Sequence, residues 1–299
     1  ERDLAKASDK LGQGPRFWEI KTNLTQLYCN MTVDFVAQHA DKPWFVNMWL
    51  NDVHDPWAPD DDSLSEVMGK GADSDDDRYL ATIVKMDHTL GKLFDRLKQM
   101  GEMDNTLVIV TSDNGPSSLQ RYYEKGHTAP GSTEHLRGRK FSLYEGGIRQ
   151  PLILYWKGHA SGYRDEQTVG QGVDLLPTLA HIAGAKVPAG GDGVDLSRVL
   201  DGQPVTARPP LFWAYGKQGA PKQPGVPSQP HDVSPRYAVR DGDWKLLANA
   251  GATDVQLYNL ASDPRETKDV ATQNTPVRER LLGKLKAWMA KLPKYQAGK

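Results

Sequence analysis

The sequence predicts an α/β fold that is followed by a small antiparallel sheet with a terminal helix. Three observations predict it: a long helical pattern directly before a continuous apolar strand, a second strand followed by a short helix, and a hairpin signal near the carboxyl end. A continuous apolar strand after a helix is typical of a parallel sheet that is covered on both faces. We expect a larger α/β domain over residues 1–203 and a small α+β subdomain over residues 204–299.

In the amino-terminal part, hydrophobic spacing predicts two helices with a short strand between them. The first helix is expected over about residues 17–39, and residues 44–50 form a short apolar run rich in strand-forming side chains. A clearer helix follows, in which the apolar residues from Tyr79 to Met100 are spaced alternately by four and three. Aspartates crowd its start, where they suit the helix dipole, and Gly101 stands where a C-cap is expected.

The middle of the chain predicts two strands and a helix. Residues 106–111 carry the strongest strand signal in the sequence, because four apolar residues lie between two threonines. A second strand is expected over residues 151–156 and a short helix over residues 173–183. The order of these elements therefore organises the first 200 residues as α/β layers.

The carboxyl-terminal part has a different composition. Prolines are frequent after residue 202, and residues 218–235 predict an extended loop. Beyond this loop, Asp241-Gly242-Asp243 is a hairpin signal between two strand-forming runs. The segments expected to form three strands and a terminal helix are residues 237–240, 244–248, 256–260 and 276–292.

Charge and hydropathy exclude several classes of protein. The chain has 299 residues with 37 basic and 38 acidic side chains, which gives a formal net charge of −1. Nucleic-acid-binding proteins usually carry a marked basic excess, so we expect no nucleic-acid partner. The mean hydropathy is −0.61, and the longest apolar runs are far too short to cross a bilayer, so no membrane span is expected. The single cysteine, Cys29, excludes an internal disulfide and a thiolate metal cluster.

Two oxygen-bearing side chains directly follow the strongest strand. Asp113 and Asn114 lie at the carboxyl end of this strand, where the functional groups of open α/β sheets collect. A carboxylate and an amide oxygen are hard donors that suit Ca²⁺ or Mg²⁺. The Asp-Asn-Gly tripeptide also suits a simple turn, because these residues tolerate left-handed backbone geometry. The tripeptide alone leaves both interpretations open.

Two further segments carry candidate functional side chains. His54 lies in a loop after a predicted strand, where an imidazole can hold an anion or transfer a proton near neutral pH. A loop histidine is also commonly a solvated surface residue. Arg137, Arg139 and Lys140 place three cations within four residues, which could hold an oxyanion such as sulfate or phosphate. A solvated basic turn is the alternative for this cluster.

Together these segments closely resemble the type I sulfatases, the formylglycine-dependent arylsulfatase-like family of the alkaline-phosphatase superfamily. The resemblance rests on residues 111–116 and 136–149 and on segments that follow in family order to about Ala271. These further segments are Val173–Ala180, Asp192–Leu196, Arg240–Leu246 and Leu257–Pro264. The resemblance implies an alkaline-phosphatase-like central mixed sheet that is flanked by helices, with the small antiparallel-sheet-plus-helix subdomain at the carboxyl end.

The resemblance also implies a chemistry and a role for individual residues. In that family a formylglycine is made from Cys or Ser, and its hydrated form attacks the sulfur of a sulfate ester with help from a divalent cation. Asp113 and Asn114 match the second pair of metal ligands, with Ca²⁺ expected and Mg²⁺ as the alternative. His54 matches a sulfate-contacting histidine that could protonate the leaving oxygen, and Lys140 matches a lysine that holds a sulfate oxygen.

A sugar-reading residue is expected in the stretch that links the metal-ligand segment to the lysine segment. This stretch, residues 117–135, contains Arg121, His127 and His135. We choose His127 as the substrate-binding residue of the three. A surface position without contact to substrate is the alternative for it.

The sequence departs from the family pattern at the nucleophile. The modification motif C/S-x-P-S-R is not present, since Cys29 is followed by Asn-Met-Thr-Val and lies in a predicted core helix. The paired aspartates of the first half of the metal site, and the Lys and His that flank the nucleophile, are also missing. We therefore expect the sequence to be the carboxyl-terminal portion of a sulfatase, with the formylglycine in an upstream, missing amino-terminal segment of the same protein.

The expected function is therefore the hydrolysis of sulfate monoesters, on a sulfated small molecule or glycan. A sulfated carbohydrate is the expected substrate, by analogy with the family alone. One alternative is a phosphomonoester or phosphonate hydrolase of the same superfamily, and the other is a non-catalytic sulfatase-like binding protein. A periplasmic or extracellular location is expected from the resemblance.

Overall fold

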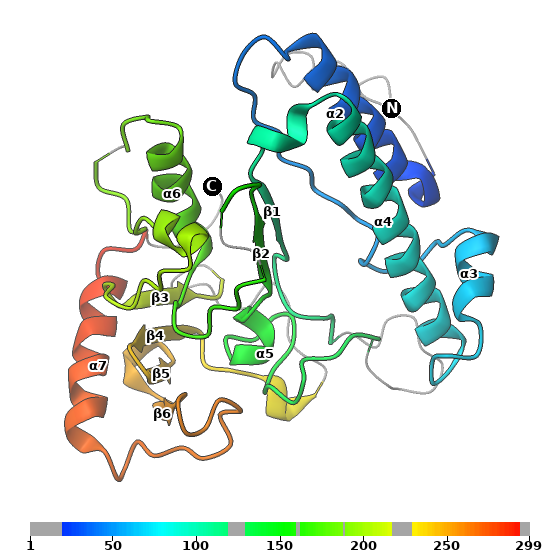
Figure 1. Ribbon diagram of the computed structural model, residues 1–299. Coiled ribbons are helices and arrows are strands. Elements are labelled where there is room, and N and C mark those ends of the chain that lie inside the picture. The colour runs from blue at the N-terminus through cyan, green and yellow to red at the C-terminus, as the bar shows by residue number, and fades with distance from the viewer. Residues whose placement is uncertain (1–19, 119–128, 160–161, 188, 217–228, 294–299) are drawn as a thin grey trace, which may run out of the picture. The chain divides into compact units, whose positions relative to one another are not determined.

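The structure is a computed structural model that describes residues 20–118, 129–159, 162–187, 189–216 and 229–293 (Figure 1). The chain divides into two compact units, residues 1–106 and residues 107–299. Residues on both sides of the expected boundary at 203 and 204 belong to the second unit. The division of the family fold into a domain and a subdomain at that point stays a prediction.

The first unit is helical in its described residues. Its elements are η1 (Lys21–Asn23), α2 (Leu24–Gln38), α3 (Asp61–Val67), α4 (Ser74–Gln99) and η2 (Glu102–Asn105). The core between α2 and α4 contains Cys29, Val33, Val36, Leu93 and Leu97, all buried. Both helices predicted from hydrophobic spacing are thereby confirmed.

The ends of α4 follow from local chemistry. The Asp73 carboxylate accepts hydrogen bonds from the backbone N–H groups of Asp75 and Asp76, at 2.9 and 3.0 Å. This capping satisfies donors that the first turn of a helix leaves unpaired. Gly101 ends the helix with φ of 79°, a left-handed conformation that glycine adopts at little cost.

The strand expected over residues 44–50 is not formed. These residues have no regular secondary structure, and Phe45 and Trp49 are 71% and 78% exposed. A strand exists only where a neighbouring strand pairs with its backbone, and no strand among the described residues pairs with this segment. Apolar, β-branched composition alone could not reveal that.

Cys29 is predicted to resist alkylation in the folded protein. Its thiol lies in the α2–α4 core at 3% exposure, and burial, with the nearby Asp52 charge, raises its pKa to about 11. At pH 8 only about one molecule in a thousand would carry the reactive thiolate. Mass spectrometry after iodoacetamide treatment should find Cys29 modified in denaturant but not in the native protein. Rapid labelling of the native protein would contradict the buried position.

The second unit combines two sheets with short helices. Its elements are β1 (Val108–Thr111), α5 (Glu145–Ile148), β2 (Leu152–Tyr155), η3 (Gly172–Asp174), α6 (Leu175–Ile182), η4 (Ser197–Asp201), β3 (Leu211–Ala214), η5 (Pro230–Asp232), β4 (Tyr237–Asp241), β5 (Trp244–Ala248), η6 (Ala250–Ala252), β6 (Gln256–Asn259) and α7 (Thr275–Met289). Every strand and helix that the sequence predicted in this part is present. β3 and the short α5 were not predicted from the sequence.

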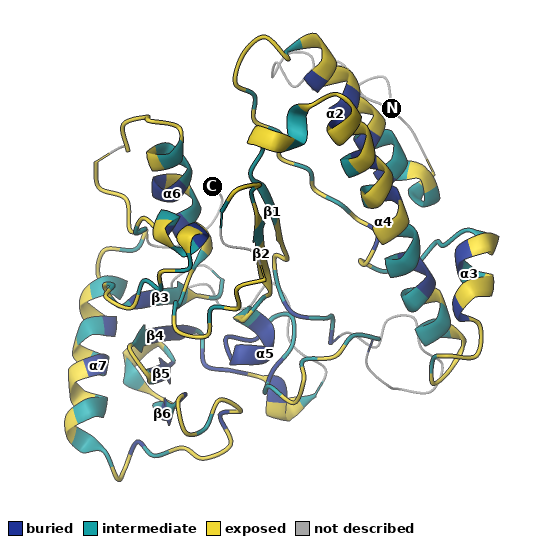
Figure 2. Cartoon of the chain, viewed as in Figure 1, coloured by how far each residue is buried: buried dark blue, intermediate teal, exposed yellow. Residues whose placement is uncertain are grey.

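The strongest predicted strand is present, but its pairing differs from the expectation. β1 pairs with β2 in antiparallel register, from Val108 opposite Tyr155 to Thr111 opposite Leu152. The expectation of a parallel partner is therefore wrong for the described strands. Leu152 and Ile153, whose side chains point to opposite faces of β2, are 45% and 59% exposed, so neither face is covered there. Figure 2 shows the exposed and buried elements of the chain. A continuous apolar run predicts that a strand forms, but it carries no information about the direction of its neighbour.

The carboxyl-terminal sheet has the order β3-β4-β5-β6 and is antiparallel throughout. Its residues alternate between two buried faces, as the twofold period of a strand requires. One face packs against α7 through Val239, Leu246, Leu257, Leu281 and Leu285, among others. The other face, with Ala238, Leu247 and Tyr258, covers Leu143 and Tyr144. This face of the sheet therefore packs against the segment that leads into α5.

None of the helices in the described part of the chain has the length and apolar character needed to cross a membrane.

Candidate functional site: two joined loops beside a short helix

The segment after β1 is attached to α5 through a glycine. The backbone N–H of Gly115 donates to the carbonyl of Gly147 at 3.0 Å. A Cβ atom at Gly115 would lie only 2.0 Å from the carbonyl oxygen of Gly146, so no other residue fits without a shift of the backbone. This close approach fixes the loop that carries Asp113 and Asn114 against α5. We call residues 112–118 the carboxylate loop.

The segment that carries Lys140 is hydrogen-bonded to the carboxylate loop. We call residues 136–144 the lysine loop. The backbone N–H of Lys140 donates to the carbonyl of Pro116 at 2.9 Å, and Arg139 Nε donates to the carbonyl of Ser117 at 3.1 Å. Ser118 Oγ donates to the Lys140 carbonyl at 3.3 Å. The structure therefore joins two segments that the sequence analysis proposed separately, although their roles stay predictions.

The donors of the carboxylate loop fit a hard cation in their chemistry. Asp113 is exposed, and Asn114 donates from Nδ2 to the carbonyl of Gly115 at 3.0 Å, which leaves its Oδ1 available as an acceptor. A carboxylate and an amide oxygen are ligands that Ca²⁺ and Mg²⁺ prefer. No group of three or more His, Cys, Asp or Glu side chains in the described ranges is arranged to hold a metal ion. Asp113 and Asn114 therefore supply part of a ligand set.

The two arginines of the basic cluster hold the lysine loop in place. Arg139 Nη2 donates to the carbonyls of Ala129 and Gly131, at 2.6 and 3.0 Å. Arg137 donates to the carbonyls of His231 and Glu266, at 3.0 and 3.1 Å, and its guanidinium stacks 3.8 Å from the ring centre of Tyr144. The interpretation of all three cations as one oxyanion site is therefore not supported, and Lys140 is the candidate that remains.

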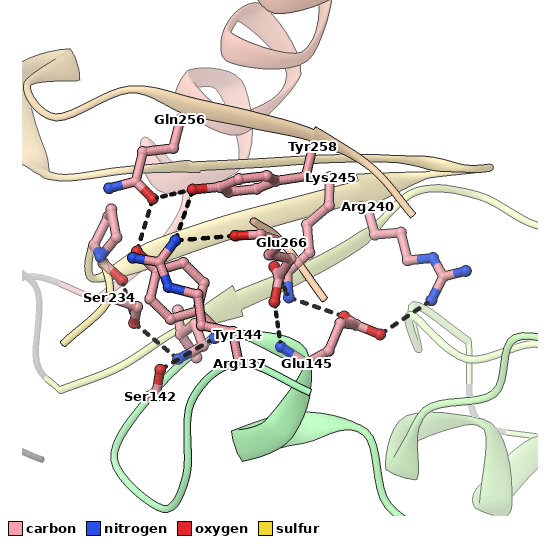
Figure 3. Close-up of polar contacts among 12 residues, drawn as sticks. Arg137, Ser142, Tyr144, Glu145, Ser234, Arg240, Lys245, Gln256, Tyr258 and Glu266 are labelled. Atoms are coloured by element: carbon pink, nitrogen blue, oxygen red, sulfur yellow. Dashed lines mark hydrogen bonds and ion pairs between the residues drawn. The ribbon is translucent and has the colours of Figure 1, made fainter. Parts of the chain in front are cut away.

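Beneath the lysine loop lies a cluster of three buried charged side chains from separate segments (Figure 3). Lys245 on β5 is fully buried, with Nζ 2.9 Å from Glu145 Oε1 and 2.9 Å from Glu266 Oε1. Glu266 Oε2 accepts a hydrogen bond from the backbone N–H of Glu145 at 2.6 Å. Arg240 approaches the other oxygen of Glu145 at 3.8 Å. We call Glu145, Lys245 and Glu266 the buried charge cluster.

The two carboxyl groups of the buried charge cluster differ in their acidity. Burial raises the pKa of Glu145, but Lys245 and Arg240 outweigh it and hold that pKa below its usual value. Burial also raises the pKa of Glu266, and there the opposing Lys245 charge does not suffice, because Glu145 adds a second negative charge. Lys245 therefore lies between one carboxyl group with a lowered pKa and one with a raised pKa.

Lys245 and Glu266 were not predicted from the sequence as residues of the site. The available signal was the position of Lys245 on its strand. Side chains on β5 point alternately to the two faces of the sheet, and Lys245 occupies an inward-facing position. A lysine that is buried there needs a buried partner of opposite charge. Nothing in the sequence identified its two partners, since Glu145 lies 100 residues before Lys245 and Glu266 lies 21 residues after it.

His54 lies in the first unit, at the edge of a cavity of about 300 Å³ lined by Lys21, Leu24, Asn51, His54, Asp55 and Pro56. Its Nδ1 is 3.0 Å from Asp55 Oδ1, and its ring is largely exposed. The Lys21 ammonium, which the sequence analysis missed, donates to the carbonyls of His54 and Pro56. Burial lowers the pKa of Lys21, while Asp52 and Asp55 oppose that change. A cation, an imidazole and a carboxylate therefore line one cavity.

The remaining substrate candidates are only partly described. His127 and Arg121 lie outside the described residues, so the sugar-reading role of His127 stays a prediction. His135 is described and exposed, and its φ of 73° places it in the left-handed region that few non-glycine residues adopt.

Comparison with known proteins gives consistent matches. The sequence matches the family described as Sulfatase over residues 3–185 and the family described as N-sulphoglucosamine sulphohydrolase, C-terminal, over residues 134–294. Human arylsulfatase A is 34% identical over 211 residues, which cover 70% of this chain and 36% of that protein. An N-acetylgalactosamine-6-O-sulfatase of Bacteroides thetaiotaomicron is 27% identical over 277 residues, which cover 85% of this chain and 49% of that protein.

A solved structure has a similar fold. The crystal structure of a sulfatase from Pseudoalteromonas sp. aligns with 92% of this chain and 55% of its own, with a TM-score of 0.66 and 23% identity. The chain spans about a third to a half of the length of the two curated relatives named above.

Proposed function

This chain belongs to the sulfatase family, whose alkaline-phosphatase-like fold it has, and on this premise we propose that the whole protein hydrolyses sulfate monoesters. The observation that carries the proposal is the hydrogen-bonded junction between the carboxylate loop and the lysine loop. This junction holds two oxygen donors for a cation and one ammonium group in adjoining segments of the second unit. A cation and an ammonium group are the charges that an oxyanion ester requires.

Each residue has a distinct role in the proposal. Asp113 and Asn114 would hold a divalent cation, Ca²⁺ by preference and Mg²⁺ as the alternative. When bound, that cation would polarise the sulfate and stabilise the charge that develops on it. Lys140 holds a sulfate oxygen by a charge-assisted hydrogen bond. His54 holds the ester and gives a proton to the leaving oxygen, and His127 contacts the sugar.

The proposed reaction needs a formylglycine, and no segment of this sequence carries the modification motif. We place the formylglycine in an upstream segment of the whole protein. The intact mass of the protein purified from its source, compared with 33.2 kDa for this sequence, tests this placement. A larger mass with a peptide that contains formylglycine is expected. An intact mass of 33.2 kDa with no co-purifying fragment would remove the nucleophile and with it the enzyme proposal.

The proposed substrate is a sulfated carbohydrate. Support comes from the relative named as an N-acetylgalactosamine-6-O-sulfatase, which aligns with 85% of this chain. The experiment compares turnover of p-nitrophenyl sulfate and p-nitrophenyl phosphate by the intact enzyme, and then tests N-acetylgalactosamine 6-sulfate. Sulfate release with little phosphate release is the expected result. Preference for phosphate would favour the phosphomonoester alternative, and no turnover of either with retained binding would favour a binding protein.

We also propose a periplasmic or extracellular location for the whole protein. Fractionation of the source cells, followed by detection of the protein with an antibody, tests it. Recovery of the protein in the cytosolic fraction would contradict this proposal.

A further inference from the structure

The buried charge cluster is expensive to build. Removing three ions from water costs free energy that their mutual attraction seldom returns with much surplus, so an apolar trio of similar volume would hold the segments together as well. Unlike apolar side chains, the ions form hydrogen bonds, which fix the orientation of the groups that make them. Lys245 Nζ donates a hydrogen bond to Glu145 Oε1 at 2.9 Å and forms an ion pair with Glu266 Oε1 at 2.9 Å, while Glu266 Oε2 accepts the backbone N–H of Glu145 at 2.6 Å. The cluster therefore fixes both the side chain and the main chain of the first residue of α5.

The backbone of Glu266 shows how firmly the cluster is held. Its φ is 53°, which places a non-glycine residue in the left-handed region, and the residue is fully buried. Such a conformation costs free energy and persists only where surrounding contacts determine it. Its carboxylate contacts Lys245 and the Glu145 N–H (Figure 3). Its main chain is held as well, because the Glu266 N–H donates to the Asp263 carbonyl at 3.2 Å and the Glu266 carbonyl accepts from Arg137 at 3.1 Å.

Both candidate loops are attached to α5 directly after this anchored residue. Gly146 N–H donates to the carbonyl of Arg137 in the lysine loop at 2.7 Å, and Gly147 accepts from Gly115 of the carboxylate loop. A Cβ atom at Gly146 would lie 2.2 Å from the carbonyl oxygen of Gly138, so the lysine loop packs directly on α5. The two loops also bond to each other at Lys140 and Pro116. A displacement of α5 therefore moves both loops.

We propose that Lys245 and Glu266 are positioning residues, which hold α5 and thereby set the carboxylate loop and the lysine loop in their mutual arrangement. The proposal rests on the proposed function for what the two loops do. It rests on the contacts of the second unit for how they are held. As positioning residues, Lys245 and Glu266 touch neither the substrate nor the cation.

The test uses Lys245→Met in the intact enzyme. Without the ammonium, two carboxylates face each other in a buried space, and α5 loses its anchor. Amide hydrogen exchange at Gly115, Lys140 and Gly146 is expected to rise by at least about tenfold. Calorimetric titration with Ca²⁺ alone is expected to show binding weakened by about 10- to 100-fold, as for other residues that orient metal ligands.

A milder variant keeps the test valid if Lys245→Met folds poorly. Glu266→Gln retains an oxygen that accepts the Glu145 N–H but removes one negative charge, so we expect only a few-fold loss of Ca²⁺ affinity. The double variant, which combines Lys245→Met with Glu266→Gln, leaves Glu145 beside Arg240 and removes the repulsion between the two carboxylates. It should recover part of the affinity that Lys245→Met loses, which is a non-additivity expected of residues in contact. A double variant that binds Ca²⁺ no better than Lys245→Met would contradict the role of the charges.

A matched control comes from another buried ion pair of the second unit. Asp174 is fully buried and pairs with Arg208 at 2.7 Å, and its carboxylate bonds to neither loop among the described residues. Asp174→Asn should lower thermal stability but leave Ca²⁺ affinity and loop exchange at wild-type values. Positioning by Lys245 is overturned if its variant keeps wild-type exchange and affinity, or if Asp174→Asn changes both equally.

The outcome separates this proposal from the proposed function. If the wild-type enzyme hydrolysed p-nitrophenyl phosphate but not p-nitrophenyl sulfate, the proposed sulfatase function would be wrong. The exchange measurements at Gly115, Lys140 and Gly146 would still decide whether Lys245 and Glu266 hold the two loops, because they need neither substrate nor turnover.

Discussion

Replacing Lys140 with alanine in the intact enzyme is expected to lower kcat/KM for a sulfate ester by about 10²- to 10³-fold. The reason is that an ammonium group beside the sulfate oxygens stabilises the charge that develops in the transition state more than the charge of the bound ester. The fold should survive the change, because the hydrogen bonds that hold this loop to Pro116 and Ser117 come from the Lys140 backbone and from Arg139. Steady-state kinetics with p-nitrophenyl sulfate measure the effect.

Two further variants separate a local effect from a general one. Lys186→Ala removes an exposed lysine of the same unit and should leave kcat/KM and thermal unfolding unchanged. Lys140→Arg keeps the positive charge with a different shape, so it should retain activity between that of the wild type and that of the alanine variant. Turnover by Lys140→Ala within twofold of the wild type would show that Lys140 does not hold the sulfate.

The Asp113→Ala variant is expected to bind Ca²⁺ at least about 100-fold more weakly than the wild type. The affinity of an oxygen-ligand site depends strongly on the number of charged ligands, and this change removes a carboxylate outright. Calorimetric titration with Ca²⁺ measures the loss directly. Turnover should fall at low Ca²⁺ and recover partly as the Ca²⁺ concentration rises, since mass action refills a weakened site.

The matched control for this variant is Asp192→Ala. Asp192 is also an exposed carboxylate of the second unit, so its removal changes the net charge equally without touching the carboxylate loop. It should bind Ca²⁺ as the wild type does. Wild-type Ca²⁺ affinity in Asp113→Ala would mean that the cation, if the enzyme uses one, is held elsewhere.

The elements that could be predicted from the sequence are those whose signal is local. Apolar spacing from Tyr79 to Met100 predicted α4, because side chains three and four apart share one face of a helix. The Asp241-Gly242-Asp243 turn signal between two strand-forming runs predicted β4 and β5. The absence of a strand at residues 44–50 and the antiparallel pairing of β1 with β2 could not be predicted, since pairing depends on a neighbour elsewhere in the chain.

By itself, the sequence determined the chemistry available to this protein: the oxygen donors Asp113 and Asn114, the ammonium of Lys140, and the motifs that place the chain in its family. Only the tertiary structure decided how these groups are held. The contacts that join the two loops, and the pairing of Lys245 with Glu145 and Glu266, link residues up to 100 positions apart. Such contacts form because the folded backbone brings their partners together, and no local pattern encodes them.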